Sequence, residues 1–348
     1  MPSVSIDAGV LAVPPVDCEI EEAHRYVDTI SDWSRLLNEP WVSIYMSERS
    51  SETLIKEGLF PLHDQLEELF TAHGIEEFAV NGVVRVVNTL LQMTPSFETY
   101  YRMQEVLTRL EDVTTNPDLL QLCASMGFQT ELARCIILIA ILRKHCTEPI
   151  LDHSLIIRSA PRQIVNVTAL IHDIQHERDD LTEIPSPPNY FEGDVLVCDD
   201  FHGLIQCLDA SAILLSAVDD VGLEAAIRVA LYKSRIARSQ EPNWDDTRGL
   251  IIGHSFRETL RECCVDQADS FAAKVLRSII DTLEGLNMRA THRLRTGQGA
   301  NDPQRTRGLD NAWRRDIDYE YHLHYWQCED GNIELGSVVV HKDMTIPE

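Results

Sequence analysis

The sequence predicts an α+β fold, in which a mostly α-helical N-terminal region precedes a smaller domain that packs helices on an antiparallel sheet. Apolar residues recur every three or four positions over residues 20–144, as in amphipathic helices. The period changes to two over residues 312–340, as in strands. We expect an acidic helical domain at 1–149, a helical or mixed segment at 150–248 that is separate or part of the first domain, and a sheet-bearing domain at 249–348.

The front of the chain predicts several helices of ordinary length. Apolar faces such as Leu62, Leu66 and Leu69 alternate with breakers at residues 74, 81–82, 94–95, 116–117 and 147–149. These breakers end each helix before it reaches the length of a coiled coil. In the middle segment, Asp194–Cys198 has the composition of a strand.

The last hundred residues predict a strand, two helices and then an antiparallel sheet. The second helix has one continuous apolar face and ends at Gly285. The expected order is a strand at Leu250–Phe256, helices at Glu258–Asp266 and Ser270–Glu284, strands at Ala312–Ile317 and Tyr321–Trp326, a turn at Glu329–Asn332 and a returning strand at Ile333–Val340.

Charge is distributed unevenly along the chain. The whole sequence carries 30 Lys and Arg against 56 Asp and Glu, a formal charge of −26. Residues 250–348 hold 12 basic and 16 acidic residues, so the first 249 residues carry −22. Such acidity disfavours a protein that coats nucleic acid over its whole surface. Within residues 287–315, however, seven arginines face two aspartates, and this local surplus can hold a polyanion.

Composition excludes several other classes. The longest apolar run, Cys135–Leu142, has eight residues, whereas a bilayer crossing needs roughly 20. Residues 1–16 lack the basic and apolar regions of a signal peptide, so we expect a cytoplasmic protein without a membrane partner. Nine cysteines include no C-x-x-C pair, which disfavours a disulfide framework or a zinc site. The oligomeric state does not follow from the sequence.

Four features of the tail occur in a familiar order. The long helix precedes a basic strand at His292–Arg295, and Trp313–Ile317 resembles an aromatic-Ser-Arg-Arg-Ile stretch. Tyr321–Tyr325 occupies the place of an H/Y-R-L-V-Y strand, and His341 ends the last strand. In this order and spacing the tail resembles the RelE/ParE toxin superfamily, in particular its RelE and YoeB ribonuclease branch. The first 249 residues have no counterpart in a free-standing toxin of this kind.

The resemblance implies a small α+β domain that enters the ribosomal A site and cleaves mRNA without a metal or other cofactor. The expected partners are therefore mRNA and the ribosome, and the expected effect is inhibition of translation. RNA can be cleaved by its own 2′-OH once a base removes that proton, cations stabilise the phosphorane and an acid protonates the leaving 5′-oxygen.

Alternation along the predicted strand divides its side chains between two faces. Tyr321, Leu323 and Tyr325 are assigned to a helix-covered face, and the even-numbered side chains to an RNA face. We expect His341 to transfer protons, Arg315 to stabilise the phosphorane, and His322 to act as a second proton carrier or phosphate donor. The expected RNA contacts are Arg293, Arg295, Arg314, His324 and Trp326, the last by stacking on a base.

The tail departs from the family pattern at two places. His322 stands where the family has an arginine, and residues 289–299 contain no acidic general base. A non-catalytic interaction protein on the same scaffold is therefore an open alternative, because the ParE branch keeps the scaffold without ribonuclease chemistry.

A second alternative is an HD-type metal phosphohydrolase. His172-Asp173, with His153 upstream and Asp219 or Asp220 downstream, has the donor types of a hydrolytic metal site. The competing interpretation is the polar end of a helix.

The acidic front suggests a regulatory role. We expect it to restrain the toxin in cis, as a separate inhibitory protein would in trans, or to dock on a basic partner. Fusions of this toxin type to sensor domains in antiphage defence are the analogous architecture.

Overall fold

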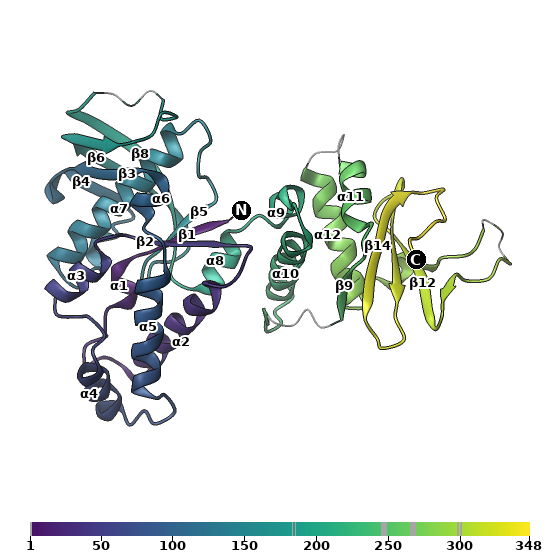
Figure 1. Cartoon of the computed structure of the whole chain (residues 1–348), viewed down its shortest axis with the longest axis horizontal. Helices are drawn as coiled ribbons and strands as arrows, with labels where there is room; N and C mark the ends of the chain where they lie inside the picture. Colours follow the sequence, from purple (N-terminus) through teal and green to yellow (C-terminus); the bar gives the residue numbers. More distant parts are fainter. Residues whose placement is uncertain are drawn as a thin grey trace. The chain divides into compact units, whose positions relative to one another are not determined.

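The computed structural model describes residues 2–182, 184, 186–244, 249–264, 269–297, 299 and 301–348 (Figure 1). The chain divides into two compact units, Met1–Cys207 and Leu208–Glu348, each with its own sheet and helices. The protein is therefore of mixed α/β class. The boundary expected at residue 249 is wrong, because helices α9 (Ala210–Ser216) and α10 (Asp220–Ala237) pack on α12 (Asp269–Leu283) of the second unit.

The first unit is built on a six-stranded mixed sheet in the order β2-β1-β5-β8-β6-β4. The first four of these run parallel, and β6 and β4 are each antiparallel to the preceding neighbour. A separate antiparallel pair joins β3 to β7. The strands are β1 (Ser3–Ile6), β2 (Ser43–Met46), β3 (Met103–Leu107), β4 (Val113–Asn116), β5 (His153–Ile156), β6 (Gln163–Ile171), β7 (Asp173–His176) and β8 (Asn189–Cys198).

The helical domain expected at 1–149 is therefore wrong, because four strands lie within it. Strands β1 and β2 are only four residues long, and β1 is buried along its whole length. A short strand buried on both faces has no alternating pattern, so it cannot be told from a helix segment by periodicity.

Helix α7 (Met126–His145) forms the core of the first unit. Its residues 132–142 are buried, and it packs against β8, β6 and β3. Within the described residues, no helix is long and apolar enough to cross a bilayer. The other helices of this unit are α1 (Ala8–Leu11), α2 (Ile20–Leu36), α3 (Ser50–Lys56), α4 (His63–His73), α5 (Val80–Met93), α6 (Phe97–Tyr101) and α8 (Phe201–Cys207), with short 3-10 turns at Leu110–Asp112 and Leu120–Leu122.

The second unit has a sheet in the order β10-β12-β13-β14-β9, with β11 beside β12. All pairs are antiparallel except that β9 runs parallel to β14. The elements are β9 (Leu250–Ile252), α11 (Phe256–Cys264), α12, a 3-10 turn (Met288–Ala290), β10 (Thr291–Arg293), β11 (Thr306–Arg307), β12 (Asp310–Asp316), β13 (Tyr321–Gln327) and β14 (Ile333–Val340). The predicted order of strand, two helices and antiparallel strands is present; residues 265–266 lie outside the described part.

One face of this sheet is covered by α11 and α12. The Phe271 ring of α12 lies 4.8 Å from that of Tyr321, and Thr259 of α11 accepts a hydrogen bond from the Val338 amide at 3.1 Å. Leu323 is fully buried. Tyr321 and Leu323 therefore lie on the helix-covered side, as alternation predicted.

A buried carboxyl group stands at the carboxyl edge of the first sheet. Asp7 follows β1, and its Oδ2 accepts a hydrogen bond from the Gly9 amide at 2.8 Å, which caps α1. Burial raises the pKa of Asp7 to about 7; the Gly9 amide opposes this, and the charge of Glu131 adds to it. Folding therefore favours the neutral carboxylic acid.

Asp7→Asn is expected to stabilise the first unit at alkaline pH. The unfolded chain releases the Asp7 proton near pH 4, whereas the folded chain holds it to about pH 7, so wild-type stability falls as pH rises between these values. The asparagine should raise the free energy of unfolding by up to roughly 4 kcal/mol at pH 8 and by almost nothing at pH 4. Urea unfolding at both pH values measures this; equal effects at the two would contradict it.

Candidate functional site

A basic cavity of about 710 Å³ lies in the second unit, between the β10–β12 edge and the residues that follow β14. Among the described residues that line it, none is a carboxylate. Arg293, Arg295, Arg314 and His341, which the sequence singled out separately, all line this cavity. The lining further includes His292, Lys342, Met344, Thr291, Trp313, Gly297 and Gly299. Several cations therefore converge on a space that can hold an anionic group.

His341 is backed by a second histidine. The Nε2 atom of His322 lies 2.7 Å from Nδ1 of His341, a hydrogen bond between the two rings. His322 is buried, whereas His341 is exposed. The two residues are brought together because β13 and β14 are antiparallel, with His322 opposite Val339.

Asp316 completes a chain of three side chains. Its Oδ1 lies 3.0 Å from Nδ1 of His322, off the axis of a linear hydrogen bond, and its Oδ2 lies 3.5 Å from Nε2 of His292. If a carboxylate holds the proton on Nδ1 of His322, then Nε2 of His322 accepts from His341, and Nε2 of His341 keeps a free lone pair. This tautomer makes His341 a base.

Burial lowers the pKa of His322, Asp316 opposes this change, and Arg314 and His341 reinforce it. His322 is 1% exposed and its Nε2 is bonded to His341. It is therefore a neutral side chain that orients His341. The expected alternative of direct phosphate binding by His322 is wrong, because it has no open path to a ligand.

Sequence reasoning missed Asp316 and His292. Asp316 pairs directly with His322 across β12 and β13, and His292 pairs with Arg314. The signal was available in principle, because the short turn between two predicted strands sets which residues face each other. It required the register of the hairpin, which alternation alone does not provide.

Arg315 is not part of this site, and its predicted role as phosphorane stabiliser is wrong. The side chain is 1% exposed and lies on the helix-covered face, opposite Leu323. Its guanidinium donates to the carbonyl oxygens of Leu286 at 2.8 Å, Asp281 at 3.2 Å and Asn287 at 3.3 Å. These carbonyls lie at and just beyond the C-terminus of α12, where helix carbonyls lack internal partners and attract a cation.

Two predicted RNA contacts are covered. Residues 343–347, here called the strap, cross the open face of the sheet. His324 is 0% exposed, with Nδ1 2.7 Å from the Thr345 carbonyl, and Trp326 is 1% exposed, donating Nε1–H to the Pro347 carbonyl at 2.9 Å. Burial lowers the pKa of His324 to about 4, although the Thr345 bond opposes this. Alternation placed both residues on the correct face, but the expectation that they are exposed is wrong.

The ligand set of the metal alternative is not assembled. Both ring nitrogens of His153 are occupied, at 2.8 Å from Ser3 Oγ and 2.9 Å from Ser5 Oγ, and burial lowers its pKa to about 3. His172 follows strand β6, not a helix, and lies 3.5 Å from Asp112. The structure therefore gives this alternative no support at His153, and the helix assigned to the segment around His172 is wrong.

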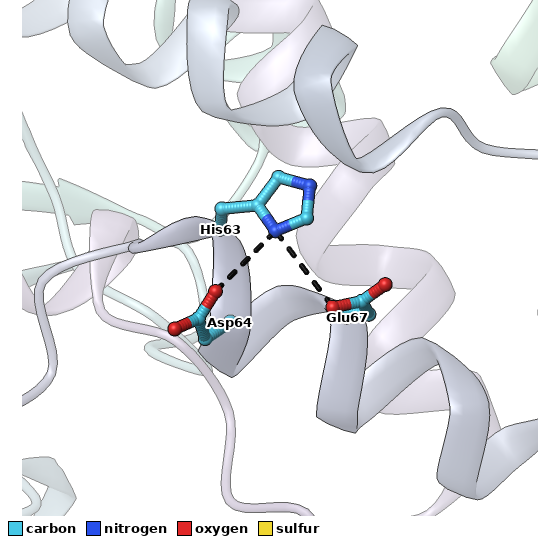
Figure 2. A group of neighbouring side chains, drawn as sticks. All are labelled: His63, Asp64 and Glu67. Atoms are coloured by element: carbon cyan, nitrogen blue, oxygen red, sulfur yellow. Dashed lines mark ion pairs between the residues drawn. The ribbon is translucent and has the colours of Figure 1, made fainter.

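One other group deserves comparison, at the start of α4. A metal ion needs several His, Cys, Asp or Glu side chains close together. Within the described part of the chain, one such group of three was found: His63, Asp64 and Glu67. Nδ1 of His63 lies 3.6 Å from Oδ1 of Asp64 and 3.8 Å from Oε2 of Glu67. Figure 2 shows the His63 ring facing both carboxylates. Both carboxylates are exposed on one turn of helix, an arrangement typical of weak surface ion pairs.

Two cavities of the first unit meet at Arg158, which follows β5. One, of about 650 Å³, is lined by Asp199 and Asp200 after β8, and the other, of about 370 Å³, by Asp7 after β1. These four residues follow the carboxyl ends of the parallel strands β1, β5 and β8. At β1 the strand order changes direction, because β2 pairs with one edge of β1 and β5 with the other. Open α/β sheets bind ligands at such points. The sequence signal is an aspartate directly after an apolar strand. The strand before Asp199 was predicted, whereas the helical interpretation of residues 1–149 concealed the strand before Asp7.

No family model matches the chain, and neither the curated proteins nor the solved structures contain a match. Function is therefore inferred from the geometry of the second unit and from the resemblance of its sequence.

Arg315→Ala is expected to destabilise the second unit by about 3 kcal/mol, because it removes a buried guanidinium that donates to three carbonyl oxygens at the end of α12 and faces Asp281 at 3.6 Å. The free energy of unfolding in urea measures this. Arg314→Ala is the control. Arg314 is half-buried on the other face of β12, so its removal should lower the free energy of unfolding by less than about 1 kcal/mol. A stable Arg315→Ala protein that lost RNA cleavage would instead return Arg315 to the site.

Proposed function

We propose that the second unit is a RelE-like endoribonuclease that cleaves mRNA, on the ribosome, and so inhibits translation. One observation carries the proposal: His341 stands in a cation-lined cavity and is hydrogen-bonded to His322, which Asp316 contacts. This places a base beside groups that stabilise a phosphorane, as cleavage by the 2′-OH requires.

The order of elements supports the resemblance. The elements follow one another in the order that the sequence of the tail predicted: β9, α11, α12, β10, β12, β13 and β14. The two helices cover one face of the sheet. The candidate residues lie on the β10–β12 edge and at the end of β14. His292 and Arg314 pair in register on the face of β12 opposite to Arg315, whereas Arg293 pairs with Trp313 and borders the cavity from the edge strand. An extended single strand of RNA fits an open, basic sheet face.

A neighbouring arginine compensates for the family arginine that is missing at position 322. The family arginine is absent there, but Arg314 lies on the strand next to it and lines the cavity with Arg293, Arg295 and Lys342. Guanidinium groups bind phosphate oxygens in pairs and stay charged at all relevant pH values. Arg314 therefore takes the phosphorane-stabilising role that was expected of Arg315.

The reaction balances without an added reagent. The 2′-hydroxyl proton passes to Nε2 of His341 while the 2′-oxygen forms a bond to phosphorus. The bond from phosphorus to the 5′-oxygen breaks, and protonated His292, which lines the same cavity and contacts Asp316, supplies the proton to the leaving oxygen. The products are a 2′,3′-cyclic phosphate and a 5′-hydroxyl.

The first unit, residues 1–207, holds 13 Lys and Arg against 33 Asp and Glu, a formal charge of −20. We propose that this acidic part regulates the ribonuclease, by competing with RNA for its basic cavity or by docking on a basic partner such as a ribosomal protein. A role in antiphage defence would follow from the architecture of a sensor joined to a toxin. An inhibitory protein acting in trans is the corresponding alternative.

The proposal is tested with the full chain on two substrates: mRNA bound to ribosomes, in the Mg²⁺ that ribosomes require, and a free fluorescent oligoribonucleotide in excess chelator. The wild type should cleave the preferred substrate to a 2′,3′-cyclic phosphate, and His341→Ala should slow that cleavage at least about 100-fold, the usual contribution of a general base. His254→Ala, a change at an exposed histidine of the same unit that does not line the cavity, is the matched control and should keep full activity. Ribosome-bound mRNA is compared with free RNA to identify the preferred substrate.

Three results would contradict this mechanism: unchanged cleavage by His341→Ala, cleavage of the free oligoribonucleotide abolished by the chelator, or cleavage of a strand with 2′-deoxy sugars. RNA binding without any cleavage would favour the non-catalytic interaction protein.

A further inference from the structure

The strap is held to the sheet through its backbone. His324 Nδ1 and Trp326 Nε1 contact the carbonyl oxygens of Thr345 and Pro347, and Nε of Arg305 donates to the carbonyl oxygen of Met344 at 3.1 Å. The side chains of His324, Trp326 and Arg305 thus each have a hydrogen-bond acceptor in a carbonyl oxygen of the strap. A different ligand with acceptors in these places would satisfy the same donors.

One strap side chain anchors the segment. Ile346 is 7% exposed and packs in a small cluster with Leu294, Ala312 and Trp326. Gly336 of β14 leaves room for it, since a Cβ atom at that position would lie 2.8 Å from Cγ1 of Ile346. The face under the strap is therefore an apolar patch, with Trp326 in it, bordered by hydrogen-bond donors.

The strap is continuous with the candidate active site. It follows His341 and Lys342 directly, and its first part, Met344, lines the basic cavity and contacts Arg314 through sulfur at 3.8 Å. An RNA strand with its scissile phosphate in this cavity would extend its neighbouring nucleotide across the face that the strap covers.

The groups beneath the strap match a nucleotide. A base presents a flat apolar face and carbonyl or ring-nitrogen acceptors at its edge, which suit a tryptophan ring and the donors of histidine and arginine. The strap offers the sheet the same chemistry, with Ile346 in place of the base plane and carbonyl oxygens in place of its acceptors.

We propose that the strap is a competitor of RNA within the same unit: it occupies the nucleotide-binding face beside the basic cavity and must lift before the substrate is cleaved. This regulation rests on the proposed ribonuclease function. The strap limits basal cleavage, and any change that loosens it raises the cleavage rate.

Hydrogen exchange of the full chain tests the displacement without using activity. The probe is an oligoribonucleotide with 2′-O-methyl groups throughout, which cannot be cleaved by its own 2′-OH. Backbone amides of the strap should exchange faster when this RNA is bound, while those of β13 should exchange more slowly or at the same rate. Slower exchange of the strap would mean that RNA binds on top of it, and would overturn the proposal.

A loosened strap tests the effect on cleavage. Asp343 Oδ1 accepts hydrogen bonds from the amide of Thr345 at 2.8 Å and from its hydroxyl at 2.7 Å, so Asp343→Ala frees the strap turn without a change in the core. We expect cleavage of unmodified RNA to rise about fivefold, which corresponds to about 1 kcal/mol. Asp330→Ala is the matched control, because Asp330 accepts from the Asn332 amide at 3.0 Å in the β13–β14 turn and should leave the rate unchanged.

Ile346→Asp removes the anchor and should increase cleavage further, with folding checked by circular dichroism. If that variant unfolds, Asp343→Ala and the exchange measurement still decide. If the wild type cleaves RNA and Asp343→Ala cleaves it no faster, the strap proposal is wrong, while the ribonuclease proposal is unaffected. RNA that is neither bound nor cleaved by the wild type and both strap variants would overturn both.

Discussion

The second unit depends on one buried interaction, the guanidinium of Arg315 against the carbonyl oxygens at the end of α12. It attaches the helix to the sheet at the place where the helix backbone has unsatisfied acceptors. Because neighbouring strand residues point to opposite faces, this contact directs Arg314 to the open side. Arg314 therefore lines the basic cavity, whereas its neighbour Arg315 holds α12 to the sheet.

Burial separates three histidines, two on β13 and one directly after β14, into different roles. His341 is exposed and meets solvent, His322 is buried behind it, and His324 lies under the strap. A histidine held neutral by burial suits the orientation of a neighbour, whereas an exposed one can exchange protons with a substrate. The strap and the cavity are adjacent, so access to the base-binding face and the geometry of proton transfer are controlled within one small region.

The first unit places its polar residues differently. Arg134 of α7 joins Ser47 after β2, at 2.7 Å, to Glu98 and Glu131, and this buried network ties the central helix to the carboxyl edge of the sheet. Asp7 lies at the same edge and is costly to ionise there. Buried charges that reduce stability are most common at functional positions, so this edge and its cavities are the part of the first unit most suited to a ligand.

Periodicity alone determined helix α12, the hairpin of β13 and β14, and the division of β13 into two faces. It determined too that arginines gather in residues 287–315, because charge density is a local property of the chain. The sheet of the first unit was hidden, since four-residue strands buried on both faces carry no period. Only the tertiary structure decided that Asp316 meets His322, that Arg315 belongs to the core and that the strap covers Trp326. Each of these depends on strand register or on contacts between distant segments, and periodicity reports neither.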